Sequence, residues 1–335
     1  MSSSLTRIFF FVAVALSSGL AGIANVGAQQ PKPKASPTPP QEQDTLLIRT
    51  NRVHLPITVV DKKGMFVAGL TKADFQIMED KVQQVIESFS DDVGRIQPLY
   101  VGVLMDTSYS TAGKLKFEQE SALNFIQTVV RARKDKVFFA TFDDDITLRQ
   151  DFTDRLDLLE KAVSGVKKLG QHTALFDAVW QFCDEKMRSV AGPRVLVVIT
   201  DGEDTYSRAD ILDAIDIAQR TETTIFAIST KEGFSGSVPG VEMGQVKDAT
   251  DRGLVKMSEE TGGAAFFTGD MLSLERSFTK IARELRAQYL VTYRSTNERY
   301  DGSYRRIDVK LGNDRNDLKI RTKRGYKAIV DSVRP

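Results

Sequence analysis

Residues 99–110, LYVGVLMDTSYS, place an apolar run directly before a loop of oxygen-bearing side chains. A run such as LYVGVLM, which holds no charged residue, is typical of a strand buried on both faces of a parallel sheet. The loop that follows has an Asp-x-Ser-x-Ser spacing at Asp106, Ser108 and Ser110. We therefore predict a buried strand that ends in one carboxylate and two hydroxyls, which can converge as oxygen ligands.

Four further apolar runs follow along the chain. They are KVFFATF (136–142), RVLVVITD (194–201), TTIFAIS (223–229) and AAFFT (264–268). Between them, apolar residues recur at helical spacing in five segments, residues 116–133, 155–169, 174–190, 207–220 and 271–288. This alternation predicts an α/β domain at residues 98–285, with a doubly wound, mainly parallel sheet.

One segment departs from the parallel pattern. ITLRQDFT (146–153) follows the acidic turn Asp143 to Asp145 and is predicted as an antiparallel strand. The turn is interpreted as a solvated hairpin and not as a second cation site.

The two ends of the chain have a different pattern, with short segments in which apolar and polar residues alternate. They lie within residues 44–97 and 286–335, and a short helical turn capped by Thr71 is expected at residues 72–75. Because short strands need partners and a face to bury, we predict that both ends form one small β-sandwich. The α/β domain would then be an insertion between its strands.

Two further oxygen-bearing residues lie where the α/β pattern predicts the same rim of the sheet. Thr173 opens a helical segment, and Asp201 ends the apolar run 194–201. Ligands of open α/β sheets bind beyond the carboxyl ends of the strands. Two carboxylates and three hydroxyls form an oxygen-only set that suits Mg²⁺ or Mn²⁺. The usual zinc sites are excluded, because the chain has one cysteine, Cys183, and only two histidines.

The charge balance excludes one class of partner. Residues 1–28 contain a single charge, Arg7, and their removal leaves 45 basic and 45 acidic residues. Such a balance provides no electrostatic surface for nucleic acid or for an anionic membrane. The lone Cys183 lies in a helical pattern and is expected to be a buried thiol.

The chain begins like an exported protein. In residues 1–28, Arg7 precedes an apolar run that closes on Val26-Gly27-Ala28, which is the order of a signal peptide and its cleavage site. The alternative is an uncleaved N-terminal membrane anchor. Residues 29–43 hold five of the ten prolines and are interpreted as an extended linker. We expect a periplasmic, cell-surface or secreted protein with no membrane insertion after cleavage.

These motifs together resemble the metal-ion-dependent adhesion site of von Willebrand factor type A domains. The resemblance covers roughly residues 98–285, and Leu175-Phe176-Asp177-Ala178 also match. It implies a metal site formed by five residues, Asp106, Ser108, Ser110, Thr173 and Asp201. The whole chain further resembles exported bacterial proteins in which this domain lies between strand-rich segments.

The function that follows from the resemblance is divalent-cation-dependent recognition of a protein ligand. An Asp or Glu carboxylate of the partner would complete the coordination of the cation. Tyr109 and His172 are candidate contacts on the rim, and the long segment 231–253 is expected to be a loop on the same rim.

Two alternatives stay open. The protein could be a structural or assembly component of a cell-envelope complex, in which the cation only stabilises the domain. A metal-assisted hydrolase would combine Ser108 or Ser110 with His172 and Asp201. The absence of a Gly-x-Ser-x-Gly motif and of a Walker loop disfavours that enzyme, so we expect no catalysis.

Overall fold

The computed structural model describes residues 52–62, 64–91, 97–111, 113–167, 169–231, 241–243, 248–267, 271–312 and 317–328. All of them belong to one compact unit, residues 49–335. The predicted signal peptide and linker lie outside the described residues. No helix of the described part is long and apolar enough to cross a membrane.

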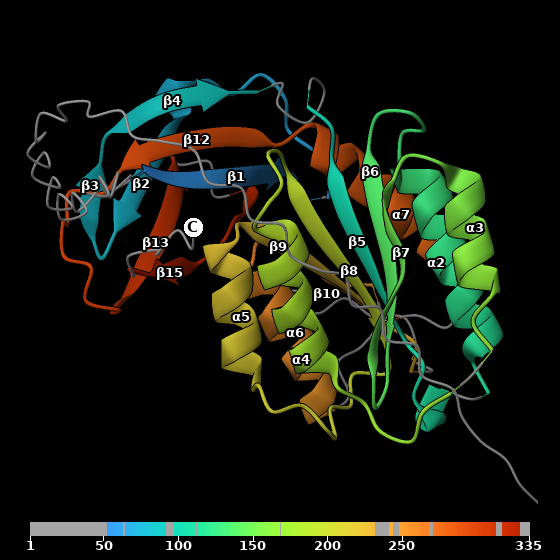
Figure 1. Ribbon diagram of the computed structural model, residues 1–335. Coiled ribbons are helices and arrows are strands. Elements are labelled where there is room, and N and C mark those ends of the chain that lie inside the picture. The colour runs from blue at the N-terminus through green and yellow to red at the C-terminus, as the bar shows by residue number, and fades with distance from the viewer. Residues whose placement is uncertain are drawn as a thin grey trace, which may run out of the picture. The chain divides into compact units, whose positions relative to one another are not determined.

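A seven-stranded sheet forms the centre of the described fold, in the order β10-β11-β9-β8-β5-β6-β7 (Figure 1). Its strands are β5 (Tyr100–Asp106), β6 (Lys136–Phe142), β7 (Ile146–Thr153), β8 (Arg194–Thr200), β9 (Thr223–Ser229), β10 (Val241–Met243) and β11 (Ala265–Phe267). All neighbours are parallel except β6 and β7. The predicted doubly wound sheet and its single antiparallel strand are confirmed.

Helices cover both faces of this sheet. They are α2 (Leu115–Val129), α3 (Leu156–Ser164), α4 (Leu175–Phe182), α5 (Ile211–Arg220), α6 (Ala249–Glu260) and α7 (Met271–Arg286). Figure 1 shows α2, α3 and α7 on one face and α4, α5 and α6 on the other. The rings of Phe125 and Phe278 join α2 to α7, with centroids 5.2 Å apart. Both faces of the strands are therefore buried, which explains their uniformly apolar sequences.

Strands from the two ends of the chain form two antiparallel sheets, with orders β14-β1-β12-β4 and β15-β13-β2-β3. Their bounds are β1 (Arg52–Val60), β2 (Phe75–Glu79), β3 (Val82–Gln84), β4 (Ile86–Ser90), β12 (Tyr289–Arg294), β13 (Tyr304–Leu311), β14 (Lys319–Arg321) and β15 (Gly325–Lys327). β1 pairs with β12 from Arg52 opposite Arg294 to Ile57 opposite Tyr289.

One apolar cluster joins these two sheets, which we call the sandwich. Leu55 and Ile57 of β1 are fully buried, as is Ile77 of β2, and Tyr289 and Tyr293 of β12 complete its centre. The fold class predicted from the two ends is therefore confirmed. The domain boundaries at residues 97/98 and 285/286 stay predictions.

Three short helical turns complete the described elements. A 3-10 turn at Lys72–Asp74, capped by Thr71, lies where the sequence predicts one. Another, Tyr109–Thr111, follows β5, and a π-turn, Cys183–Met187, extends α4. The thiol of Cys183 is buried, and this burial raises its pKa to about 12. It is therefore an unreactive core group, as its helical context predicts.

The expected loop at residues 231–253 is wrong in part. The described residues of this segment include strand β10 and the start of α6, whereas residues 232–240 and 244–247 lie outside the description. The carboxylate of Asp248 accepts a hydrogen bond from the amide of Asp251, which caps α6. The segment was predicted as a loop because of the glycines and the proline before Asp248. These residues say nothing about the helix that begins at Ala249.

Candidate functional site

The loop after β5 gathers three of the predicted ligands. Asp106, the last residue of the strand, is fully buried, and its Oδ1 accepts a hydrogen bond of 2.9 Å from the amide of Ser108. The hydroxyls of Ser108 and Ser110 are 3.0 Å apart. The hydroxyl of Thr111 donates to the carbonyl of Ser108 and fixes the turn. One carboxylate and two hydroxyls are thus held in a single turn, as their spacing predicts.

The end of β8 brings a second carboxylate beside the first. β5 and β8 are parallel neighbours, and the hydroxyl of Thr200 donates to Asp106 Oδ2 at 2.6 Å. Asp201 follows directly, is 5% exposed, and accepts from the amide of Glu203. Gly202 has a φ of +87°, a conformation that favours glycine and that turns the chain away from the strand end.

The segment with Thr173 is fastened to both of these loops. The amide of Gly170 donates to the carbonyl of Thr107, which lies in the first loop. Thr173 is 2% exposed; its amide donates to the hydroxyl of Thr205, and its carbonyl accepts from the amides of Thr205 and Tyr206. Thr173 is therefore fixed at the same rim of the sheet as the other predicted ligands.

Burial and nearby negative charge raise the pKa values of two acids at this rim, Asp106 and Glu118. Burial raises the pKa of Asp106 to about 6, with a smaller contribution from the negative charge of Asp201. Glu118, on α2, is fully buried, and its pKa is raised to about 9 by burial and then by the charge of Asp106. The negative charges of Asp106 and Asp201 thus act on each other and on Glu118, and a cation beside the two aspartates would offset that repulsion.

Unsatisfied oxygens provide a test of whether a cation fits. The hydroxyls of Thr230 and Thr111 lie near the carboxyl group of Glu118, but among the described residues neither its two oxygens nor the hydroxyl of Thr230 makes a hydrogen bond of good geometry. Buried oxygens without partners are costly in the absence of a ligand. Together with the oxygen-only donor set, they fit a hard divalent cation such as Mg²⁺ or Mn²⁺.

A metal site built mainly from His, Cys, Asp and Glu is not found in the described part of the chain. That part holds no group of three or more His, Cys, Asp or Glu side chains placed around a common metal position. The candidate site differs because three of its five members are hydroxyls, at Ser108, Ser110 and Thr173.

Aromatic side chains border the candidate site on the surface. Tyr109, in the turn itself, is 66% exposed. His172 stacks on Tyr206, with ring centroids 5.1 Å apart and planes inclined by 16°, and Tyr206 is 56% exposed. Sequence reasoning missed Tyr206, although its position five residues after Asp201 was a usable signal.

The acidic hairpin turn supports the rim. Asp143 accepts a hydrogen bond of 2.6 Å from the hydroxyl of Thr107. Asp144 accepts from the amide of Gln171 and contacts His172 Nδ1 at 2.5 Å. These contacts hold the loop before Thr173 in place, so the described turn serves a structural role.

The grouping that a hydrolase needs is not formed by these contacts. Among the described residues, the hydrogen-bond partner of His172 is Asp144, and the hydroxyl of Ser108 pairs with that of Ser110. The carboxylate of Asp204, which follows Asp201 by three residues, accepts a hydrogen bond from the amide of Phe176 at the start of α4. It is therefore engaged in holding that helix. The arrangement can hold a cation but does not assemble a nucleophile and base.

Comparison with known proteins identifies the family. The model of the von Willebrand factor type A domain matches residues 101–280, more than half of the chain. The chain therefore belongs to the von Willebrand factor type A domain family. A comparison with curated protein sequences finds no match.

Solved structures with a similar fold come from several organisms. A von Willebrand factor type A protein from Catenulispora acidiphila is 10% identical over 84% of this chain and 75% of that chain, with a TM-score of 0.45. An aerotolerance-related membrane protein from Bacteroides fragilis is 15% identical over 56% of this chain and 98% of that chain, with a TM-score of 0.43. Proximal thread matrix protein 1 of the mussel byssus, with a zinc-occupied MIDAS motif, is 14% identical over 63% of this chain and 50% of that chain, with a TM-score of 0.45.

Proposed function

We propose that this protein is an exported binding module that recognises a protein carboxylate through a divalent cation. The proposed ligands of the cation are Asp106, Ser108, Ser110, Thr173 and Asp201, and the cation is Mg²⁺ or Mn²⁺. The observation that carries the proposal is the junction of β5 and β8, where Asp106 is held by Ser108 and Thr200 beside Asp201.

In the proposed binding, different residues have different roles. The bonds from Ser108 and Thr200 orient the two oxygens of Asp106 before any ligand arrives, which lowers the entropic cost of binding. A bound cation supplies an electrophilic centre with a coordination position for an Asp or Glu of the partner. The exposed rings of Tyr109 and Tyr206 would contact the surface around that carboxylate.

The first experiment is a calorimetric titration of the EDTA-treated protein with Mg²⁺ and with Mn²⁺. We expect binding by the native protein and at least a tenfold loss in Asp106→Ala. Asp145→Ala is the matched control, because it removes an exposed carboxylate from the nearby hairpin turn. Equal binding by native protein and Asp106→Ala would contradict the assignment of the site.

A second measurement separates recognition from a purely stabilising role. Water-proton relaxation of the Mn²⁺-loaded protein reports water molecules on the cation, and added acetate should displace one of them. A relaxation signal unchanged by acetate, together with a higher unfolding temperature in Mn²⁺, would favour the structural alternative.

A further inference from the structure

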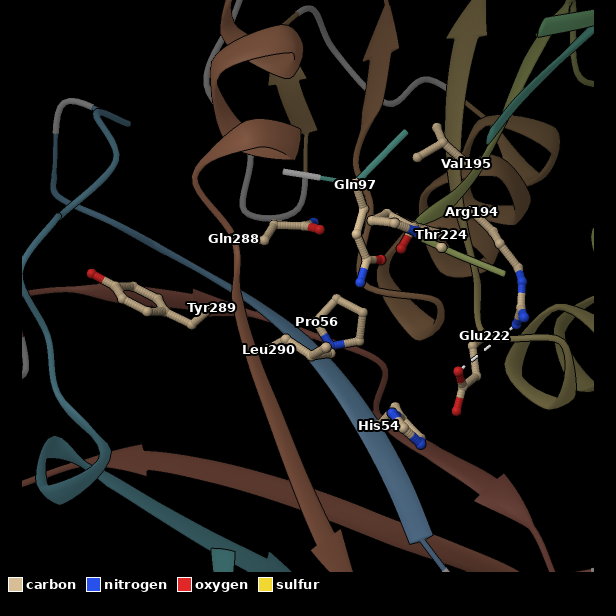
Figure 2. A pocket seen from close by; sticks show the side chains of 12 residues that line it. His54, Pro56, Gln97, Arg194, Val195, Glu222, Thr224, Gln288, Tyr289 and Leu290 are labelled. Atoms are coloured by element: carbon tan, nitrogen blue, oxygen red, sulfur yellow. Dashed lines mark ion pairs between the residues drawn. The ribbon is translucent and has the colours of Figure 1, made fainter. Parts of the chain in front are cut away.

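A cavity lies at the end of the central sheet that is opposite to the candidate cation site. There the sandwich meets the turn between α5 and β9. The cavity encloses about 290 Å³ and is lined by β1, β13 and β15 and by that turn. We call it the Lys323 cavity. A neighbouring hollow of about 370 Å³ shares two of its lining residues, His54 and Glu222. Figure 2 shows both in that hollow, with Glu222 joined to Arg194 by an ion pair.

The lining of the Lys323 cavity is strongly basic. Among its described residues, one is acidic, Glu222, and its carboxylate already lies 3.8 Å from Arg194. The basic lining residues are Arg52, Arg220, Arg305, Lys323 and Lys327. The charge that the lining presents to the cavity is therefore positive.

Acids behind the wall compensate some of these cations. Arg52 lies 2.9 Å from Glu87, and Lys327 lies 3.3 Å from Asp216. Arg305 lies 3.5 Å from Glu79, and both are 2% exposed. These pairs fix the positions of three cations and leave the cavity itself without an acid of its own besides Glu222.

Lys323 differs from the other three. It is 7% exposed, and within the described part of the chain its ammonium group makes neither a direct ion pair nor a hydrogen bond. Its Nζ lies 5.7 Å from the centre of the Tyr326 ring, which also lines the cavity. Burial lowers the pKa of Lys323, and the charge of Glu222 offsets this only in part because Arg194 lies beside that carboxylate.

We propose that the Lys323 cavity binds a small oxyanion, a phosphate or a carboxylate group, with Lys323 as its principal contact. An oxyanion would provide the direct partner that Lys323 lacks among the described residues, and charge-assisted hydrogen bonds to lysine and arginine are the strong ones in protein sites. The volume admits a small molecule that carries such a group.

This second site is independent of the cation site. Glu222 precedes β9 and Arg194 begins β8, so the cavity lies at the amino ends of strands whose carboxyl ends carry Asp201 and Thr230. The proposal can therefore fail or succeed whatever happens to the cation site.

The test measures the thermal unfolding midpoint of the full chain with inorganic phosphate or malonate. Chloride keeps the ionic strength constant, and EDTA keeps the cation site empty. A ligand that binds only the folded protein raises the midpoint with its concentration, so we expect one of the two anions to do so. Stabilisation by phosphate alone assigns a phosphate ligand, and stabilisation by malonate alone assigns a carboxylate.

Lys323→Met removes the charge and keeps an unbranched chain of similar length. We expect it to weaken anion binding about tenfold or more. Lys116→Met is the control, because that lysine is 89% exposed on α2, and it should bind like the native protein. If Lys323→Met does not fold, Arg52→Gln makes the same test, because Arg52 is half-exposed and lines the cavity. Stabilisation no greater than in chloride, or an unchanged response in the folded variant, would overturn the proposal.

Discussion

At the scale of single residues, Glu118 is a carboxyl group held in an environment very different from water. Its side chain projects from α2 into the acids of the candidate site, and its pKa is raised to about 9. The folded protein therefore holds a proton that the unfolded chain releases near the ordinary glutamate pKa of 4.5. Between these pH values the unfolded state binds fewer protons, so stability falls as the pH rises.

Glu118→Gln should remove this part of the pH dependence. The slope lost is at most about 1.4 kcal/mol per pH unit, because one proton is involved. Urea unfolding in EDTA between about pH 5 and pH 8 would measure it, with Glu120→Gln as the control on the exposed side of the same helix. Curves of equal slope for the native protein and Glu118→Gln would refute the raised pKa.

The positions of the proposed ligands were easier to predict from the sequence than the residues that surround them. Asp106, Ser108 and Ser110 are recognisable by spacing, because one loop must hold all three. Glu118 was missed, although an acid that shares the buried helix face of Ala122 was a signal. Thr200 was also missed, because a threonine at a strand end looks like an ordinary strand residue until its hydroxyl meets Asp106.

At the scale of elements, the start of α5 is fixed by a reciprocal cap. The side chain of Asp210 accepts from the amides of Leu212 and Asp213 at 2.7 and 3.0 Å. The side chain of Asp213 accepts in turn from the amide of Asp210 at 3.1 Å. Two backbone donors of the first turn and that of Asp210 are thereby satisfied.

Asp210→Ala should lower the free energy of unfolding by about 1 kcal/mol, because the cap of α5 is lost. Urea denaturation would measure the change. Asp157→Ala is a useful comparison, because Asp157 is an exposed acid in the first turn of α3 and should have a smaller effect. An effect of Asp210→Ala no larger than that of Asp157→Ala would show that the cap contributes little.

The elements were predicted to different degrees, for physical reasons. The central strands are continuous apolar runs, so β5, β6, β8 and β9 lie close to their predicted bounds. Helix α6 was missed because two of its four buried residues, Asp251 and Ser258, are polar, so that its apolar face is short. The pairing of β1 with β12 could be proposed in general, but its register depends on contacts between distant segments.

At the scale of the whole molecule, a buried ion pair joins the sandwich to the α/β part. Arg321 of β14 lies 2.6 Å from Glu284 of α7, and their side chains are 9% and 5% exposed. A buried pair of this kind adds little relative to apolar residues, but loss of one member leaves the other charge in a poorly solvated position. Removal of one member should therefore destabilise the protein strongly, whereas replacement of both members by apolar residues should cost little.

Arg321→Met should lower the free energy of unfolding by roughly 3 kcal/mol, and Glu284→Met combined with Arg321→Met should recover most of that loss. Chemical denaturation of both variants would test this. Arg155→Met serves as the control, since its partner Asp157 is exposed, and should cost less than about 1 kcal/mol. A double variant as unstable as the sum of its single variants would refute the coupling.

The pairing of β1 with β12 has a consequence for the order of folding. Arg52 of β1 faces Arg294 of β12, and most of the chain lies between these two residues. The first strand therefore leaves the ribosome long before its partner strand has been synthesised. The central sheet, residues 100–267, can assemble in the meantime, and its completion shortens the effective loop that separates β1 from β12. We therefore expect that the strand made first is among the last to find its partner.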